Sequence, residues 1–346
     1  MTRRHTFNFG QQESTVLTVP RAELFSGIAE SCFYVADTNT ERYLPASGPR
    51  VVLPAGEGSK SWVELEHLVR EMLGAGLSRD SAMVGVGGGV VCDIASFAAS
   101  VYMRGCDLVL MPSTLLAMVD AAVGGKTSIN FGGYKNMVGT FYPAREVRLD
   151  AELLFTLPQR EYLSGLGEVI KSAMLGDPEL LTSLEQNVDL MEKRNDELLS
   201  DTVWRCVMVK GRIVERDLRE SSGRVHLNLG HTFAHALESV SGLGVWTHGE
   251  AVAWGLAQAM ELGLRSGVTN ERYAARIVAI LRAYGYSLER EPRLADALLD
   301  AMWRDKKVRA GRLRFVLQQD VAKTRLVEVD EALVHRMLRE EFILER

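Results

Sequence analysis

The hydrophobic pattern of the chain changes character near its midpoint. From about residue 15 to residue 150, short β-branched runs such as Arg50–Leu53 and Asp107–Met111 alternate with helix-like stretches. Each run ends in turn-forming residues, which is typical of a mostly parallel α/β sheet. After Pro158 the β-branched runs give way to long segments with helical periodicity. The sequence therefore predicts an α/β fold, with a sheet domain over residues 1–157 and an all-helical domain over residues 158–346.

The 346 residues are enough for two domains with their own cores, because 47% of them are hydrophobic. One run in the second half, at residues 312–317, alternates apolar and polar side chains. This run is predicted to form a short strand or hairpin within an otherwise mainly helical domain.

Charge and cysteine usage narrow the possible partners and compartment. The net charge of -5 and pI near 5.9 argue against nucleic-acid binding, which normally needs a broad basic surface. The four cysteines form no CxxC pair, and no apolar run approaches the length of about 20 residues that spans a membrane. The first residues lack the apolar stretch of a signal peptide. We expect a cytoplasmic protein that does not bind membranes.

Glycines at positions 87, 88 and 89 follow one of the predicted strands and precede a predicted helix. A turn without side chains lets backbone N–H groups and the helix N-terminus approach a pyrophosphate. The pattern is not a full GxGxxG, since Val90 takes the place of the third glycine. Dinucleotide binding and a merely tight structural turn are both open on this signal. Polar residues in two other turns, Asp37–Asn39 and Glu57–Lys60, favour the nucleotide.

Histidines cluster between residues 226 and 248, which hold four of the seven in the chain. His231 and His235 are four residues apart and would share one helix face, a spacing that suits a divalent metal. The alternative is a buried histidine pair without a ligand, and His226 is interpreted as structural. Glu168 and Lys171 share a face of an apolar helix, where a buried carboxylate needs a partner such as a metal.

Two glycine-containing loops between residues 120 and 136 each deliver a lysine, Lys126 and Lys135. Such loops suit anionic oxygens. The Gly-Gly-Lys-Thr ending is similar to a Walker A loop, but Asp120 occupies the place of its first glycine, which excludes an NTPase of this type. Other basic side chains could complete an anion pocket: Arg104, Lys210, Arg224, Lys306 and Lys307.

A series of motifs between residues 35 and 320 resembles the 3-dehydroquinate synthase family, and the motifs have the order and spacing of that family. The motifs are Gly87–Asp93, Tyr102–Gly105, Pro112–Asp120, Gly124–Thr127, Lys135–Asn136, Glu168–Lys171, Leu227–Phe233 and His248–Ala253. The resemblance implies a Rossmann-like NAD-binding domain followed by a helical metal- and substrate-binding domain. It also implies a homodimer and a zinc ion that cobalt can replace.

Matching the family's functional positions to this chain assigns roles to individual residues. The implied metal ligands are Glu168, His231 and His248, which moves His235 from the metal to proton transfer. The implied catalytic residues are Asp120, Lys171, Glu220 and His235. Substrate binding is implied for Arg104 of the neighbouring subunit and for Lys126, Asn136, Lys210, Arg224, Asn228, Lys306 and Lys307. NAD contacts are implied for Asp37, Asn39, Glu57, Lys60, Gly87, Gly88, Gly89, Asp93, Ser113, Thr114 and Lys135.

The reaction implied by this resemblance converts 3-deoxy-D-arabino-heptulosonate 7-phosphate to 3-dehydroquinate and phosphate in the shikimate pathway. Three positions depart from the family pattern: Cys92 and Ala234 replace glycines, and the glycine between Glu220 and Arg224 is shifted to Gly223. Two alternative functions remain. One is that of a different sugar-phosphate cyclase, of amino-dehydroquinate or valiolone type, and the other is that of a metal- and NAD-dependent polyol dehydrogenase. Lys210, Arg224 and Asn228 suit a substrate carboxylate, which argues against a valiolone-type enzyme.

Overall fold

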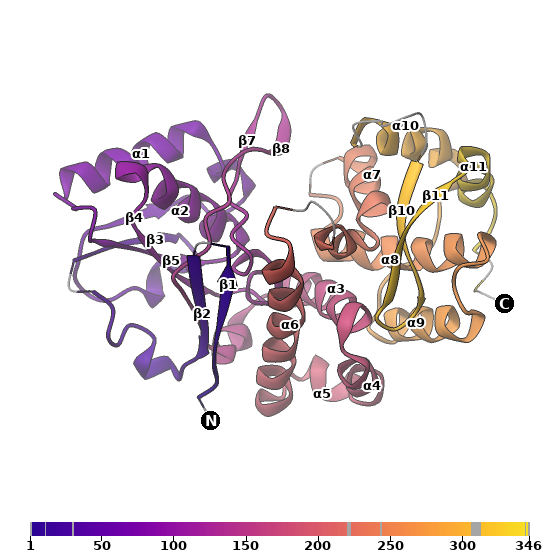
Figure 1. Cartoon of the computed structure of the whole chain (residues 1–346), viewed down its shortest axis with the longest axis horizontal. Coiled ribbons are helices and arrows are strands. Elements are labelled where there is room, and N and C mark those ends of the chain that lie inside the picture. Colours follow the sequence, from indigo (N-terminus) through magenta and orange to yellow (C-terminus); the bar gives the residue numbers. More distant parts are fainter. Residues whose placement is uncertain are drawn as a thin grey trace. The chain divides into compact units, whose positions relative to one another are not determined.

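The structure is a computed structural model that describes residues 2–10, 12–29, 31–219, 223–242, 244–305, 313–342 and 344. The chain divides into two compact units (Figure 1). The first comprises Met1–Pro158 and Lys210–Arg219, and the second comprises Gln159–Val209 and Glu220–Arg346. The division after Pro158 lies one residue beyond the predicted boundary. The return of Lys210–Arg219 to the first unit was not predicted.

The first unit contains a sheet of seven strands in the order β1-β2-β9-β6-β5-β3-β4. Only β1 and β2 pair antiparallel, and the other neighbours are parallel, as the alternating pattern predicts. The strands are β1 (Arg4–Phe9), β2 (Gln12–Thr18), β3 (Cys32–Asp37), β4 (Arg50–Leu53), β5 (Ala82–Gly87), β6 (Asp107–Pro112) and β9 (Glu146–Leu149).

The parallel strand order has a switch point between β3 and β5. The chain proceeds from β3 outward to β4 and then returns to the other side of β3 to form β5. Ligands of open α/β sheets bind at such a point, outside the carboxyl ends of the strands. Buried valines at positions 84, 86 and 109 form the core around these strands. The sheet thus places the loops after β3 and β5 side by side.

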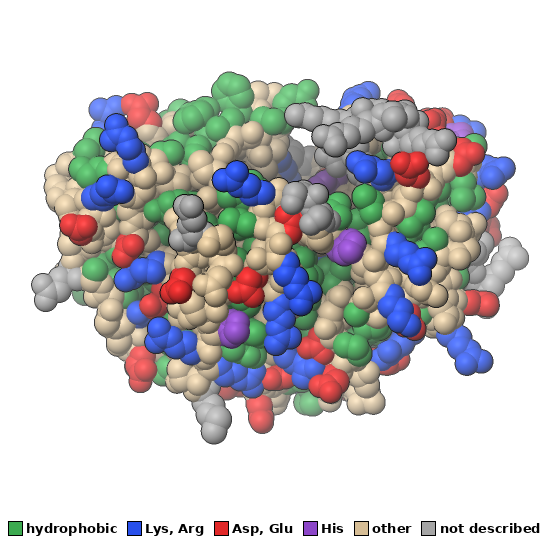
Figure 2. All heavy atoms as spheres, viewed as in Figure 1, with side chains coloured by type: hydrophobic (Ala, Val, Ile, Leu, Met, Phe, Trp, Pro, Cys, Tyr) green, Lys and Arg blue, Asp and Glu red, His purple; other side chains and the backbone are tan. Residues whose placement is uncertain are grey.

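The first unit also contains two α-helices and a separate hairpin. Helices α1 (Trp62–Gly74) and α2 (Gly89–Val101) flank β5 along the chain, and α2 starts directly at the glycine turn. Strands β7 (Ile129–Phe131) and β8 (Tyr134–Val138) form a separate antiparallel hairpin. Apolar side chains of this hairpin lie on the surface (Figure 2), and Tyr134 is 67% exposed.

In its described residues, the second unit consists of helices and one hairpin of strands β10 (Leu313–Asp320) and β11 (Lys323–Val329). This hairpin is the one that the alternating run at residues 312–317 predicts. The helices are α3 (Gln159–Gly176), α4 (Pro178–Gln186), α5 (Val188–Glu192), α6 (Asp196–Arg216), α7 (His231–Ser241), α8 (His248–Arg265), α9 (Glu271–Ala283), α10 (Ala295–Asp305) and α11 (Glu331–Arg339). Among the described residues, no helix combines the length and apolar character needed to cross a membrane.

Helix α6 explains why Lys210–Arg219 belongs to the first unit. It runs without interruption from Asp196 to Arg216, so it begins in the second unit and ends in the first. A Cβ added to Gly211 would lie 2.1 Å from the ring of Phe7 on β1. The glycine therefore allows the end of α6 to pack directly on the sheet. The hydrophobic pattern identifies the helix but not which core each half joins.

Candidate active site

Loops at the carboxyl ends of the parallel strands hold most of the residues assigned to NAD. After β3, Asp37 Oδ1 accepts the backbone N–H groups of Asn39 and Thr40 at 2.9 and 3.0 Å. Thr40 Oγ1 in turn donates to the carbonyl of Val86 on β5 at 2.9 Å. These bonds join the loop after β3 to the strand that leads into the glycine turn. Ser113 and Thr114 directly follow the end of β6 at the same edge.

Gly87 and Gly88 have different roles in the glycine turn. A Cβ on Gly87 would lie 2.5 Å from Cγ2 of Val91, so helix packing alone requires glycine there. Gly88 precedes helix α2 as its N-cap and supplies no side-chain hydrogen bond to the helix. The first N–H groups of α2 are therefore available to an anion, in the manner of dinucleotide-binding turns. The structural and the nucleotide-binding interpretations of this turn are thus compatible.

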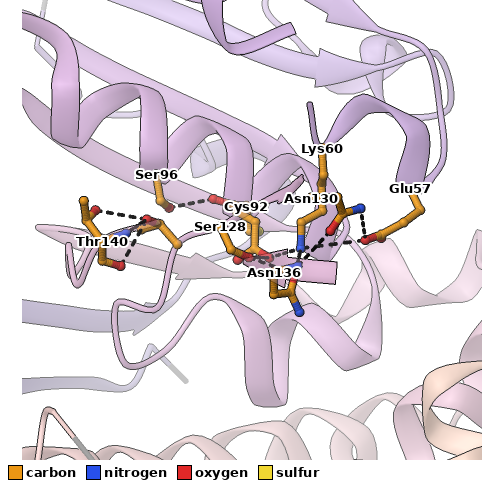
Figure 3. A network of polar contacts seen from close by, with 10 residues as sticks. Glu57, Lys60, Cys92, Ser96, Ser128, Asn130, Asn136 and Thr140 are labelled. Atoms are coloured by element: carbon orange, nitrogen blue, oxygen red, sulfur yellow. Dashed lines mark hydrogen bonds and ion pairs between the residues drawn. The ribbon is translucent and has the colours of Figure 1, made fainter. Parts of the chain in front are cut away.

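A polar network links the loop after β4, helix α2 and the β7–β8 hairpin (Figure 3). Lys60 Nζ lies 2.5 Å from Asp93 Oδ2 and also donates to Asn136 Oδ1. Asn130 Nδ2 donates to Glu57 Oε1 at 2.8 Å. Burial raises the pKa of Asp93, and the Lys60 ammonium opposes that rise. Asn136, assigned to the substrate, therefore contacts a lysine assigned to NAD.

Asp120 and Lys210 form a second charged pair in the first unit. Asp120 lies in a π-helical segment, Ala117–Ala121, a form that often occurs at functional sites. Buried Lys210 Nζ donates to Asp120 Oδ1 at 2.5 Å and to the Asp120 carbonyl at 2.7 Å. The end of α6 thus supplies a lysine to this segment. Apart from Lys60, which is also buried, the other basic side chains assigned to this unit are exposed: Arg104, Lys126 and Lys135.

The second unit contains a group of three potential metal ligands, Glu168, His231 and His248. One ligand atom from each residue lies within 4.8 Å of the others. Glu168 Oε1 is 3.5 Å from His231 Nε2 and 3.3 Å from His248 Nε2. A carboxylate and two imidazoles form a common donor set for zinc that leaves a position open for a substrate or water.

The burial of Glu168 tests whether this group fits a cation. Its side chain is 1% exposed, and neither carboxylate oxygen has a hydrogen bond of acceptable geometry, although Lys171 Nζ lies 2.5 Å away. A buried carboxylate without hydrogen bonds is costly unless a cation compensates it. Burial alone would raise the pKa of Glu168, but Lys171 and the two histidines hold that pKa well below its usual range. The donor set and its charge therefore fit a divalent metal.

Contacts on the far side of each imidazole orient the two histidines. His231 Nδ1 lies 3.2 Å from the carbonyl of Leu229, and His248 Nδ1 lies 3.6 Å from Glu238 Oε2. Such partners typically direct the opposite nitrogen toward a metal. Burial would lower the pKa of His248, but Glu168 and Glu238 together raise it to about 10. Glu238 was not singled out from the sequence, although it follows His231 by seven residues on the same helix face.

Close packing of helices α3 and α8 brings Glu168 and His248 together. A Cβ on Gly249 would lie 1.6 Å from the carbonyl oxygen of Ser164, and the N–H of Gly249 donates to Ser164 Oγ at 3.1 Å. A Cβ on Gly167 would in turn lie 2.4 Å from the carbonyl oxygen of Gly249. The absence of side chains at two neighbouring positions lets the start of α8 rest on the middle of α3.

His235 lies beside the three potential ligands but is not one of the group. Its ring centroid is 5.4 Å from that of His231, on the next turn of α7. Buried Arg224 and half-buried Asn228 occupy one short 3₁₀ segment, Arg224–Asn228, that leads to α7. The remaining assigned positions lie outside the described residues: Glu220, Lys306 and Lys307.

Two further residues of the polar network were missed in the sequence. Ser128 Oγ lies 3.2 Å from Asp93 Oδ2 and 2.9 Å from Asn136 Oδ1, and Asn130 bonds Glu57. Both lie in the lysine-rich loop region that the sequence singled out. Only the three-dimensional position of the hairpin shows that they face the nucleotide-side residues.

Both halves of the chain match models of one protein family. Residues 50–164 match the model described as 3-dehydroquinate synthase N-terminal, and residues 165–308 match 3-dehydroquinate synthase C-terminal. The chain is 41% identical over 280 residues to the 3-dehydroquinate synthase of Geobacter metallireducens, covering 81% of this chain and 78% of that protein. It is 38% identical over 291 residues to that of Shewanella loihica, covering 83% and 81%.

Solved structures of several other proteins have a similar fold. A 2-deoxy-scyllo-inosose synthase complexed with carbaglucose-6-phosphate, NAD+ and Co2+ has a TM-score of 0.88 at 23% identity, covering 98% of this chain and 100% of that chain. A 2-epi-5-epi-valiolone synthase from Streptomyces hygroscopicus with NAD+ and Zn2+ has a TM-score of 0.84 at 27% identity, covering 93% and 95%. A probable glycerol dehydrogenase from Sinorhizobium meliloti has a TM-score of 0.60 at 16% identity, covering 96% and 97%.

Proposed function

Because this chain belongs to the 3-dehydroquinate synthase family, we infer that it catalyses that family's reaction. The substrate is 3-deoxy-D-arabino-heptulosonate 7-phosphate, and the products are 3-dehydroquinate and inorganic phosphate. The reaction consists of transient oxidation, phosphate elimination, re-reduction and aldol cyclisation, so it causes no net redox change. The enzyme is a phosphate-eliminating carbon–oxygen lyase of the shikimate pathway.

The observation that carries this proposal is the buried group of Glu168, His231 and His248 beside Lys171. Within the described residues, the Glu168 oxygens have the Lys171 ammonium nearby but no hydrogen bond of acceptable geometry, and the donor set suits zinc, with cobalt as an alternative. NAD is proposed to bind at the switch point of the sheet, between the turn after β3 and the glycine turn. When bound, the cation supplies Lewis acidity and NAD accepts and returns a hydride.

The protein's own residues bind the substrate and move protons. Lys126, Lys171, Lys210 and Arg224 offer positive charge to the carboxylate and phosphate, which fixes the position of the reacting carbons. His235 adjoins the proposed metal ligands and is proposed to transfer the proton needed for phosphate elimination. The Asp120–Lys210 pair holds a carboxylate and an ammonium together, so Lys210 is oriented before the substrate arrives. Glu220, Lys306 and Lys307 keep their proposed acid–base and phosphate-binding roles.

The second candidate function is a valiolone-type cyclase, because one such enzyme has a TM-score of 0.84 at 27% identity. The residues that favour a substrate carboxylate are Lys210, Arg224 and Asn228. The carboxylate that is proposed to contact buried Arg224 is present in the heptulosonate phosphate and absent from a heptulose phosphate. The sequence relatives also favour the heptulosonate, since both that are described above are 3-dehydroquinate synthases.

We further propose a cytoplasmic homodimer in which Arg104 reaches the neighbouring active site. Met103 and Arg104 both have positive φ, 47° and 69°, so the turn holds the arginine in a strained, exposed conformation. Val101 and Met103 expose 44% and 45% of their surface beside it. A second copy of the chain would bury these apolar side chains and receive the guanidinium. The four cysteines are free and buried, in keeping with a reducing compartment.

A phosphate-release assay tests the proposed function. Purified chain with NAD+ and zinc should release inorganic phosphate from the heptulosonate phosphate without accumulating NADH at 340 nm. Sedoheptulose 7-phosphate serves as the matched substrate without a carboxylate. Turnover of that sugar alone would favour the valiolone-type enzyme, and steady NADH production would favour a polyol dehydrogenase.

A further inference from the structure

Asn130 makes three polar contacts from the middle of strand β7. Its backbone N–H donates to the Lys60 carbonyl at 2.8 Å, and its side-chain Nδ2 donates to Glu57 Oε1 at 2.8 Å. Its Oδ1 accepts the backbone N–H of Asn136 at 2.9 Å. Figure 3 shows Asn130 between Glu57 and the residues of the hairpin. One side chain thus bonds both the loop after β4 and the return strand β8.

The chemistry of these contacts requires an amide. A carboxylate such as Glu57 only accepts hydrogen bonds here, whereas the backbone N–H of Asn136 only donates. Asparagine satisfies both partners in one orientation. An aspartate at position 130 would still accept from Asn136 but would place a second negative charge against Glu57, and an alanine would satisfy neither partner.

Asn136 receives its orientation from the same network. Its backbone φ is 55°, in the left-handed region that asparagine tolerates better than most residues. Its Oδ1 accepts from Lys60 Nζ and from Ser128 Oγ. Because an ammonium has no acceptor, the amide oxygen of Asn136 must face Lys60, and its NH₂ group points away from the network, as Figure 3 shows. That NH₂ group is then available to a substrate oxygen.

We propose that Asn130 is a positioning residue that couples the nucleotide site to the substrate site through the β7–β8 hairpin. The inference rests on the proposed function, in which Glu57 and Lys60 contact NAD and Asn136 contacts the substrate. Without the Asn130 amide, the Glu57 carboxylate loses a hydrogen-bond donor. The backbone N–H of Asn136, whose φ is in the left-handed region, loses its acceptor. The Kd for NAD+ and the KM for the substrate then rise together. The metal ligands of the second unit keep their contacts.

The experiment uses the full zinc-loaded chain and NAD+ as the probe in isothermal titration calorimetry. Asn130→Asp is expected to raise the Kd for NAD+ about tenfold, since a like charge replaces a hydrogen bond. Asn130→Ala, which adds no charge, is expected to raise it about threefold. In steady-state assays KM for the heptulosonate phosphate rises more than kcat falls, and zinc content stays at the wild-type level. Asn8→Asp is the matched control, because Asn8 is exposed on β1, and it should bind NAD+ like the wild type.

A double-mutant cycle separates this role from simple destabilisation. In Asn130→Asp combined with Glu57→Gln, the glutamine amide can donate to the new carboxylate, which restores the contact with reversed polarity. The double variant is expected to bind NAD+ as tightly as Glu57→Gln alone. Wild-type NAD+ affinity in Asn130→Asp, or the same tenfold loss in both backgrounds, would overturn the inference while phosphate release by the wild type still supports the function. A wild-type chain that neither binds NAD+ nor releases phosphate would contradict the function itself.

Discussion

At the scale of single residues, the two histidines of helix α7 have different surroundings. His231 Nε2 faces the buried Glu168 carboxylate, while His235 lies one turn farther along the helix. The spacing of four residues suggests two equivalent ligands, whereas the structure pairs His231 with His248 on another helix. Spacing along one helix cannot show which distant side chain completes a metal site. The family resemblance implies His248 as a ligand, because it carries information from many folded chains.

His231→Ala and His235→Ala should therefore behave differently. The first removes a member of the three-residue group and is expected to abolish zinc binding. The second leaves the group intact and is expected to retain zinc but to lower kcat by about 10²-fold or more. Metal analysis of dialysed protein, together with phosphate-release kinetics, distinguishes the two. Equal loss of zinc in both variants would contradict the proposed role of His235.

Asp177 provides a pH-dependent contribution to stability. It caps helix α4 by accepting from the N–H of Leu180 at 2.9 Å and pairs with Arg205. Burial would raise the pKa of Asp177, but the Arg205 guanidinium and the cap hold that pKa below its usual value. A depressed pKa stabilises the fold above the unfolded pKa of about 3.9, and this contribution is lost as pH falls through the folded value.

Asp177→Asn keeps a good N-cap but removes the charge. It is expected to lower the free energy of unfolding at pH 7 by about 1 kcal/mol, and the difference from the wild type should shrink below about pH 4. Urea unfolding at pH 7 and at pH 3.5 measures both values. A difference that stays constant with pH would show that the ion pair with Arg205 contributes nothing.

At the scale of elements, the approach of α8 to α3 determines whether the proposed metal ligands Glu168 and His248 meet. Gly249→Ala would place a methyl group 1.6 Å from the carbonyl oxygen of Ser164, so the start of α8 must move. His248 precedes this residue and moves with it. We expect weaker zinc binding and a loss of about 3 kcal/mol of stability from overpacking. Gly74→Ala at the end of α1 is the matched control, because its added Cβ meets no described atom within 4 Å beyond its chain neighbours and its own helix backbone.

Sequence patterns predict the elements better than they predict their partners. The β-branched runs Arg50–Leu53 and Asp107–Met111 became strands β4 and β6, since their turns and periodicity are local properties. The β10–β11 hairpin was likewise visible as an alternating run. The contacts of Asn130 and Glu238 were not predicted, because each bonds a residue that neither periodicity nor spacing connects to it. Strand order, which creates the switch point, also depends on packing of the whole sheet.

At the scale of the whole molecule, the proposed shared active site can be tested by complementation. Arg104→Ala and Lys171→Ala homodimers should both be nearly inactive, since each lacks one group at every site. Unfolding and refolding an equal mixture forms heterodimers in which one of the two sites is intact. We expect recovery of about a quarter of the wild-type activity for random pairing. A mixture as inactive as its parents would mean that Arg104 serves its own subunit or no site.

The return of Lys210–Arg219 to the first unit has a consequence for how the chain folds as it is made. During synthesis the strands and helices up to Pro158 emerge first, yet Phe7 and Asp120 still lack their partners, Gly211 and Lys210. The ribosome must add about 60 more residues, most of them belonging to the second unit, before the first unit can complete its fold. A nascent chain stalled before residue 210 would therefore be more open to proteolysis than one stalled beyond residue 219.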